Sequence, residues 1–530
     1  MKDSFFRSMT WLHTWVGLSV CWLLLVIFFA GTLSFFRPEI NLWMQPAFHQ
    51  VPLLTEPQRQ AQQYQWLERG IAKLQQQAPD ATHWYLYLPD ERSPLLGLAY
   101  EGSSKDAEYQ EHYYDPATMS KIDGQRQTQG GDFFYRLHFD LHYLDVLTAR
   151  WLVGFASLFM LIALISGVVI HKRIFVDMFS FRANKGSRSW LDLHNVSSVL
   201  ALPFHLMITY TGIMTLIFLY FPYAVSTAYD GDFDQFFQQI DPTWQSVSAT
   251  GEKAIITNVD AVLQQAQKHV PEATLSRLTV EYPNDRAASF LFSAANGTAV
   301  RDYEHQLRID AATLQVMAES PAELSASATL NDSMTALHTG RLAHPLLRWL
   351  YFFCGLAGCV MIASGCIMWA KRIRERLKQP ASWGLKLVET LNLGTVLGLP
   401  LATAGFFYAN RLLPLDLPDR AQWEIHCFFL CWFAFLCVGC WRRDRLVWRF
   451  GSLAVALALA GVPLVSALTT ELNLFDYLHQ GHWMLAGVEL VCLLFALFFL
   501  LLARGISQFA TAPRSAPQAM PQPTRQEFAK

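Results

Sequence analysis

The chain has 530 residues, of which 52% are hydrophobic and 16% are charged, and its formal net charge is −2. So low a charged fraction is unusual for a soluble protein and ordinary for one that crosses a membrane several times. The near-neutral charge gives no indication of nucleic-acid binding. The nine cysteines lie in or beside apolar runs, so no disulfide framework is predicted.

Eight apolar runs are long enough to form membrane-spanning helices. They lie at about 11–36, 149–171, 194–221, 346–370, 385–409, 423–441, 448–468 and 482–503. The first run is too long for the core of a signal peptide, and no small-residue cleavage site follows it. We therefore expect it to remain as an anchor.

Basic residues gather before the first run and in three short connections between runs. They are Lys2, Arg7 and the Lys and Arg residues of 172–188, 371–386 and 442–449. The connection 469–481, on the other side, has none. Because positive charge in short loops marks the cytoplasmic side, both termini are predicted to be cytoplasmic. The two long connections, 37–148 and 222–345, then lie outside the cytoplasm.

The two long connections share one internal pattern. In the first, an amphipathic helix over 58–77 precedes strands at 84–88, 95–100 and 109–114; in the second, a helix over 259–270 precedes strands at 275–282, 288–294 and 303–309. Both end alike, with Asp115-Pro-Ala-Thr-Met119 and Asp310-Ala-Ala-Thr-Leu314. Each connection is predicted to form a small α+β module, a helix against a short antiparallel sheet.

The similarity extends into the spans, so the chain is predicted to contain an internal repeat of helix, module and helix. His13 precedes Gly31 by 18 residues, and His194 precedes Gly212 by the same number. Further matches are Leu137-His138 with Leu337-His338, Arg150-Trp151 with Arg348-Trp349, and Ser166-Gly167 with Ser364-Gly365. Because both copies begin inside, a pseudo-twofold axis is expected along the membrane normal.

The repeat aligns four histidines in two pairs. His13 and His194 lie at the cytoplasmic ends of the first and third spans, and His138 and His338 at the outer ends of the second and fourth. A twofold axis brings equivalent residues face to face, as a planar macrocycle with one axial ligand on each side requires. Neutral imidazole is a common ligand of haem iron. We therefore predict an inner haem held by His13 and His194 and an outer haem held by His138 and His338.

Three further histidines are candidate ligands. His142 lies one helical turn after His138, so it is an alternative to it or a partner for a propionate. His171 begins a basic run and is interpreted as interfacial, whereas His205 is 11 residues after His194, roughly 16 Å deeper along the helix. Shifts of the helices would make either His171 or His205 the partner of a cytoplasmic-side histidine. Structural roles, in which a ring caps a helix or bonds to a neighbour, are the competing interpretation.

The other histidines are expected to be solvated or interfacial. His49, in the first module, is predicted to face solvent, and His426 is predicted to lie at a span end near the outer surface. The sequence has no Cys-x-x-Cys-His, which excludes thioether attachment of a haem.

Several motifs occur in the order found in the PepSY-associated transmembrane family, which the chain resembles over about residues 1–378. They are Trp11-Leu-His13, Arg136-Leu-His138-Phe-Asp-Leu-His142, Ser166-Gly167-Val-Val-Ile-His171, Leu191-Asp-Leu-His194-Asn, Leu202-Pro-Phe-His205 with Thr211-Gly212, and Leu337-His338-Thr-Gly-Arg341. Some members are inner-membrane ferric-siderophore reductases with two haems. The resemblance implies two PepSY domains, about two b-type haems, and electron transfer to a ferric siderophore in the periplasm.

The expected fold is a polytopic α-helical membrane protein of about eight spans in the bacterial inner membrane, with two periplasmic α+β modules. The expected parts are the spans 1–36, 149–171, 194–221 and 346–370, the modules 37–148 and 222–345, the cytoplasmic loops 172–193 and 371–384, a four-helix extension 385–504, and a disordered cytoplasmic tail 505–530.

Two questions stay open at this point. No Gly-x-Gly-x-x-Gly follows a strand in a cytoplasmic stretch, so the electron donor is a free reduced flavin, a flavoprotein or quinol. A non-redox role, in which the modules bind or regulate a transporter or peptidase partner, is the alternative function.

Overall fold

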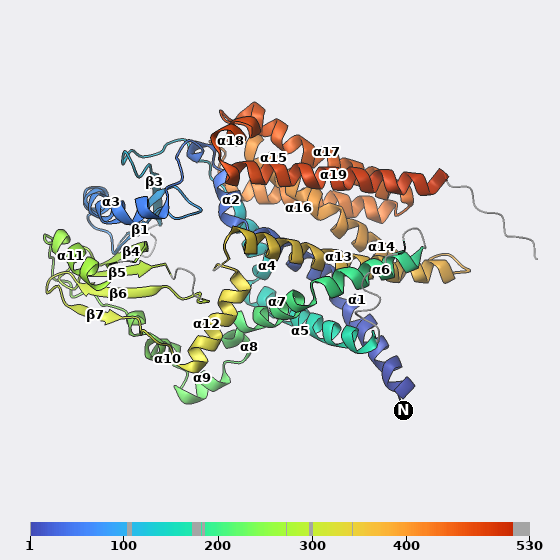
Figure 1. Cartoon of the computed structure of the whole chain (residues 1–530), viewed down its shortest axis with the longest axis horizontal. Coiled ribbons are helices and arrows are strands. Elements are labelled where there is room, and N and C mark those ends of the chain that lie inside the picture. Colours follow the sequence, from blue (N-terminus) through green and yellow to red (C-terminus); the bar gives the residue numbers. More distant parts are fainter. Residues whose placement is uncertain are drawn as a thin grey trace, which may run out of the picture.

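The computed structural model describes residues 2–511 except 103–108, 172–181, 183–185, 272, 296–299 and 342. Most of the predicted connection 172–193, and residues 512–530 of the predicted tail, lie outside this part of the chain. Long helices lie side by side, and a β-sheet stands at one end of the helical bundle (Figure 1). The N-terminus lies at the end of the bundle away from the sheet (Figure 1).

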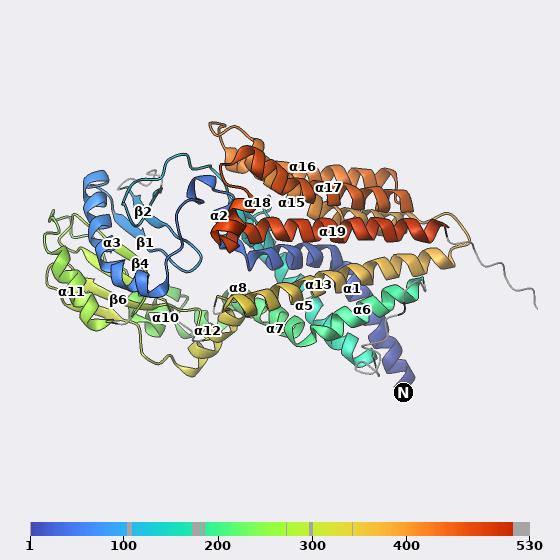
Figure 2. The same cartoon turned by 45° about the horizontal axis from the view of Figure 1, so that its top comes forward.

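Four long helical segments form the first part of the bundle. They are α1 (Lys2–Ser34), α5 (Val146–Ile170), the pair α6 (Ser187–Leu200) and α7 (Leu202–Thr215), and α13 (Pro345–Arg376). Helix α1 packs against α5 and α13, and α13 packs against α6 (Figure 2). Seven helices of the described residues are long and apolar enough to cross a membrane, or eight if the bent pair α6–α7 counts as one span. These helices make the chain a multi-pass membrane protein.

The third span is broken, where one continuous helix over 194–221 was predicted. Helices α6 and α7 meet at an angle of 69°. Pro203 has no N–H to donate to the carbonyl of Val199, and the N–H of Ala201 donates to it instead. The helix therefore ends at Leu200 and restarts at Leu202.

Short helices connect the long ones to the sheet. They are α2 (Arg37–Trp43), η1 (Pro46–Phe48), α4 (Gly130–Asp140), α8 (Ile217–Tyr220), α9 (Tyr223–Ala228), α10 (Phe233–Ile240), η2 (Pro242–Trp244) and α12 (Ala326–Thr339). Helices α2 and α12 lie between the sheet and the long helices (Figure 1), and α4 packs against α1. Helix α8 lies within the predicted span 194–221, and the other seven elements were not predicted from the sequence.

The two predicted modules form one antiparallel sheet of seven strands. Its order is β3 (Gln110–Tyr114), β2 (Leu96–Glu101), β1 (His83–Tyr87), β4 (Leu275–Glu281), β5 (Ser289–Ala294), β6 (His305–Asp310) and β7 (Val316–Glu319). Strand β1 pairs with β4, and Tyr85 lies opposite Thr279 at the centre of the pairing. The prediction of two separate short sheets was therefore wrong, because β1 of the first module pairs with β4 of the second.

One hydrophobic core fills the space between the sheet and two helices, α3 (Glu56–Gln77) and α11 (Val259–His269). Side chains alternate along β1, so Trp84 and Leu86 are buried while His83, Tyr85 and Tyr87 lie on the other face. Trp66, Leu67, Ile71 and Leu74 of α3 enter the same core. The predicted strands and both predicted helices lie within two residues of the observed elements, apart from β7, which was not predicted.

The last 129 described residues form a further group of helices, which we call the extension. It consists of α14 (Trp383–Val396), α15 (Gly398–Leu412), α16 (Arg420–Trp441), α17 (Arg445–Thr469), α18 (Leu474–Gln480) and α19 (Trp483–Thr511). Buried side chains of α14 to α19 belong to the same hydrophobic cluster as those of α1, α4 and α5. The extension is therefore packed into the bundle and is not a separate unit.

Candidate functional site

His13 and His194 lie next to each other at the end of the bundle away from the sheet. Their ring centroids are 6.2 Å apart and the rings are inclined by 71°. His13 comes from α1 and His194 from α6, and both side chains are half-buried. We call these two residues the far-end pair.

His138 and His338 form a second pair at the end of the bundle nearest the sheet. Their ring centroids are 6.0 Å apart and the rings are inclined by 30°. His138 lies on α4 and His338 on α12, the two short helices that follow the strands of each module. We call them the sheet-end pair. The two pairings predicted from the repeat are thus the two that the structure brings together.

Each of the four rings is oriented by the same kind of hydrogen bond, from Nδ1–H to a backbone carbonyl. In the far-end pair, His13 donates to Ala163 (2.9 Å) and His194 to Met361 (2.8 Å). In the sheet-end pair, His138 donates to Ile27 (2.8 Å) and His338 to Ile208 (3.0 Å). Because Nδ1 carries the proton, Nε2 keeps its lone pair, as a metal-binding imidazole requires.

A glycine lies against each of the four rings. A methyl group placed on the glycine would be 3.2 Å from the His13 ring at Gly167, 3.1 Å from His194 at Gly365, 2.7 Å from His138 at Gly31 and 2.8 Å from His338 at Gly212. The distances at Gly31 and Gly212 are shorter than Cβ atoms normally allow, so the rings of His138 and His338 occupy space that glycine leaves free. At Gly167 and Gly365 a methyl group would make a tight contact that a small shift of the ring could relieve. These glycines occupy matching positions in the predicted repeat, but their contact with the histidine rings was not predicted from the sequence.

The two pairs are separated along α1. The carbonyl that holds His138 belongs to Ile27, which is 14 residues after His13 in the same helix. That number of residues corresponds to about 21 Å of helix. The pairs therefore stand near opposite ends of the spans.

His205 lies apart from both pairs. Its ring is fully buried against Phe28, with centroids 6.2 Å apart, and its Nε2 donates to the carbonyl of Cys354 at 3.2 Å. Its Nδ1 makes no hydrogen bond within the described residues. With Nε2 protonated and no second histidine beside it, His205 differs from the four paired residues.

His171 and His142 are also outside the pairs. His171 follows the last residue of α5, and its Nε2 lies 3.1 Å from the side-chain amide of Asn195, the neighbour of His194. His142 stacks on Phe429 of α16, with centroids 5.7 Å apart, and has a positive φ of 55°. The structure does not bring His142 against His338.

His49 was predicted to face solvent, and that prediction was wrong. Only 2% of His49 is exposed; its Nε2 lies 3.1 Å from the carbonyls of Leu42 and Trp43, and Tyr477 is hydrogen-bonded to its Nδ1 at 2.9 Å. Burial, with a smaller contribution from the charge of Arg411, lowers the pKa of His49 to about 3. The reason is the extension, which covers the segment after α1.

The geometry of the two pairs fits a metal ion that already has most of its ligands from a cofactor. Two metal–nitrogen bonds of about 2.0–2.1 Å, with one ring on each side, place the ring centres roughly 6 Å apart. Within the described residues no three His, Cys, Asp or Glu side chains group together as a metal site. A bare ion would therefore have only two of these side chains as ligands at either pair, whereas the iron of a haem already has four porphyrin nitrogens and could be held by the two imidazoles.

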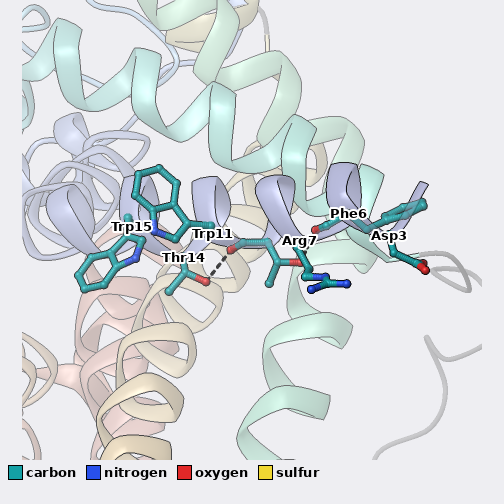
Figure 3. Close-up of a pocket in the computed structure, with 7 residues that line it drawn as sticks. Asp3, Phe6, Arg7, Trp11, Thr14 and Trp15 are labelled. Carbon is teal, nitrogen blue, oxygen red and sulfur yellow. Dashed lines mark hydrogen bonds between the residues drawn. The ribbon is translucent and has the colours of Figure 1, made fainter. Parts of the chain in front are cut away.

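A hollow of about 590 Å³ lies on the outer face of α1 (Figure 3). All of its lining residues belong to α1; they are Asp3, Phe6, Arg7, Thr10, Trp11, Thr14 and Trp15. Tryptophan with charged residues one turn further out is typical of a helix at a membrane–water boundary. The hollow includes neither histidine of the far-end pair, so it is not part of the candidate site.

Comparison of the sequence with known proteins shows which family the chain belongs to. Over 361 residues the chain is 24% identical to Uncharacterized protein PA4219 of Pseudomonas aeruginosa, an alignment that covers 65% of this chain and 87% of that protein. The family model described as the PepSY-associated TM region matches residues 10–372, which include all four paired histidines and end before the extension. The chain therefore belongs to the PepSY-associated transmembrane family.

Proposed function

We propose that this protein is a haem b oxidoreductase of the bacterial inner membrane that passes electrons outward to reduce ferric siderophore in the periplasm. The observation that carries the proposal is the pair of histidines at each end of the bundle, with ring centroids 6.2 and 6.0 Å apart and each Nδ1 bonded to a backbone carbonyl, so that each Nε2 keeps its lone pair. The resemblance of the sequence motifs to di-haem reductases supports the same function.

His13 and His194 would hold one haem, and His138 and His338 the other. Bound haem supplies a one-electron carrier near each face of the membrane. The contribution of the chain is to fix four imidazoles through carbonyls of Ala163, Met361, Ile27 and Ile208 and to leave glycine-sized space behind each ring. Carbonyl hydrogen bonds of this kind set ring orientation and raise the basicity of the metal-binding nitrogen.

The substrate would gain one electron, which converts Fe(III) to Fe(II). Hard oxygen ligands hold Fe(III) much more tightly than Fe(II), so reduction releases the metal from the siderophore. The sheet and the sheet-end pair would lie in the periplasm, and the far-end pair near the cytoplasm. The support for this orientation is the basic residues at the ends of the spans and in the short connections, including Arg374 and Arg376 in the last turn of α13 and Arg442 and Arg443 after α16.

The support for the proposed repeat is that both pairs join corresponding residues of its two copies. Their carbonyl partners also correspond, since Ile27 and Ile208 each follow the first histidine of their copy by 14 residues. A pseudo-twofold axis between the two copies accounts for both pairs at once.

The deciding experiment is a reduced-minus-oxidised difference spectrum of the purified protein, with haem counted per chain after acid-acetone extraction. We expect low-spin bis-histidine haem, about two per chain, that is fully extractable. Protein reconstituted in vesicles with an internal reductant should then reduce an external ferric siderophore. Absence of a haem spectrum, in protein purified from cells grown with added haem, would instead favour the non-redox role. In that role the protein would bind a transporter or peptidase partner.

Orientation is tested separately. Reporter fusions at residues 110 and 280 should report the periplasmic side, because both lie on the sheet. A cytoplasmic signal from either position would contradict the proposed direction of electron flow.

A further inference from the structure

The extension lies outside the region that the family model matches. Buried charged side chains of the extension form two hydrogen-bonded networks with α2 and with the connection that precedes α4. Arg420 and Glu424, one turn apart on α16, are both completely buried and form an ion pair. Removing two charges from water is costly unless every donor and acceptor finds a partner. The partners of this pair therefore show what the extension is built around.

Two of those partners come from the connection before α4. Arg420 donates to the carbonyl of Gln127 at 3.0 Å, and Glu424 accepts from the hydroxyl of Thr128 at 2.5 Å. Asn410 of α15 completes the group, since its side chain donates to Glu424 at 2.9 Å and its carbonyl accepts from Arg420 at 2.6 Å. The connection 126–129 is thus built into the charged network of the extension.

Arg126 extends the same contact to the segment after α1. Its guanidinium donates to the carbonyl of Asn410, and its backbone N–H and carbonyl both bond to the side chain of Gln45, at 2.8 and 2.6 Å. The connection before α4 is therefore fixed on one side by α15 and on the other by the residues that follow α2.

A second network holds α2 itself. Arg411 donates to the carbonyl of Trp43 at 2.7 Å and lies 3.9 Å over the indole ring. The indole N–H of Trp43 donates to the buried carboxylate of Glu489 on α19 at 3.0 Å. Cation–π contact and a buried hydrogen bond both act on one side chain, so Trp43 is fixed from two helices of the extension.

These contacts reach the sheet-end pair through α4. The hydroxyl of Thr128 accepts from the N–H of Gly130, the first residue of α4, at 3.0 Å, and Asn41 of α2 accepts from the N–H of Gly131 at 2.7 Å. Further along α4, Phe133 and Phe134 pack on Phe406 of α15 and Phe428 of α16, with ring centroids 4.9–6.3 Å apart. His138 lies one turn beyond Phe134.

We propose that the extension is a clamp on α4 that fixes the position of His138 relative to His338. Arg420, Glu424, Asn410, Arg126 and Thr128 are positioning residues in this arrangement. They act on the sheet-end pair and leave the far-end pair untouched. The proposal rests on the proposed function only for its consequence on bound haem; the clamp itself is a property of the protein alone.

The first test measures the clamp without any cofactor, by hydrogen–deuterium exchange in full-length protein. Thr128→Val keeps the shape of the side chain and removes the hydroxyl that joins Glu424 to the start of α4. We expect exchange in peptides covering 128–140 to rise about three- to tenfold, as for the loss of one hydrogen bond from a locally opening segment. Sheet peptides should not change. Unchanged exchange in 128–140 overturns the proposal.

Two matched controls separate the clamp from general loosening. Thr395→Val removes a hydroxyl that bonds within α14 to the carbonyl of Leu391, and Thr335→Val removes one that bonds within α12 to the carbonyl of Asn331. Neither should change exchange in 128–140. A rise as large as that of Thr128→Val in the Thr395→Val protein also overturns the proposal, because the effect would then not depend on the contact with α4.

The second test uses haem-loaded protein. Thr128→Val and Glu424→Gln should shift the midpoint potential or the electron paramagnetic resonance g-values of one haem and leave the other unchanged, whereas both controls leave both unchanged. Equal shifts of both haems, or none, contradict the clamp. If no form of the protein binds haem, the proposed function is wrong, and the exchange experiment alone tests the clamp. If Glu424→Gln does not fold, both tests are made with Thr128→Val.

Discussion

Gly31 and His138 are in direct contact across α1 and α4: a methyl group on Gly31 would lie 2.7 Å from both Cε1 and Nδ1 of the imidazole. The ring is held in that place by the carbonyl of Ile27, four residues earlier in the same helix. Helix α1 therefore supplies both the hydrogen bond that orients His138 and the space that the ring fills.

The first prediction follows from this contact. Gly31→Ala should displace His138 and weaken binding of the sheet-end haem, because overpacking of a fixed ring costs about 1–3 kcal/mol, or roughly 5- to 150-fold in affinity. The measurement is haem content per chain on titration with haem. Gly17→Ala on the same helix is the control, since nothing lies within 4 Å of a methyl group there. Equal haem binding by both variants would show that the ring has room to move.

The second prediction concerns the pairs. His13→Ala and His194→Ala should each remove the same haem, and His138→Ala and His338→Ala should each remove the other, because a bis-histidine site loses most of its hold when either axial bond is lost. Haem content should fall from about two to about one per chain in all four variants. The haem that remains should have one absorption spectrum in the two far-end variants and a different spectrum in the two sheet-end variants. Different remaining spectra within a pair would disprove the pairing.

The third prediction is that His205→Ala keeps both haems. The Nε2 of His205 already donates to the carbonyl of Cys354, and its ring contacts in the described part of the chain are with Phe28 and Phe204 rather than with another histidine. The variant should lose about 1–3 kcal/mol of stability from the unfilled space and the unpaired carbonyl, measured as a lower unfolding midpoint. His205→Leu is the control, because Leu24 occupies the corresponding position of the first copy. Loss of a full haem in the alanine variant, with both kept in His13→Ala, would instead assign an axial role to His205.

The fourth prediction is a pH dependence from His49. Its pKa is about 3 in the folded chain and near 6.5 when unfolded, so the unfolded chain takes up the proton first as the pH falls. The contribution of His49 is complete above pH 6.5 and declines toward about pH 3. His49→Gln should therefore flatten the fall in unfolding midpoint between about pH 7.5 and about pH 5. His479→Gln, an exposed residue of α18, should leave the fall unchanged; an equal flattening by both would count against His49.

The local elements of the sheet could be predicted because their signal is local. Trp84 and Leu86 alternate with polar and tyrosine side chains, and this period of two defines a strand with one buried face. The partners of the histidines could be predicted for a different reason. Alignment of the two proposed copies supplied long-range information, because the histidines that it matches are the ones that lie together.

Other features depend on partners that no local pattern names. The joining of β1 to β4 satisfies two strand edges that would otherwise be open, but a sequence does not record which edge meets which. The burial of His49 depends on Tyr477, 428 residues later. The break between α6 and α7 did have a signal, Pro203, which the length and apolarity of the run outweighed.

The pairing of β1 with β4, centred on Tyr85 opposite Thr279, has a consequence for symmetry. Equivalent strands of two identical subunits meet antiparallel when a twofold axis passes between them. Two copies of a chain half as long, each ending after its second span, would therefore rebuild this sheet and place one histidine of every pair on either side of the axis.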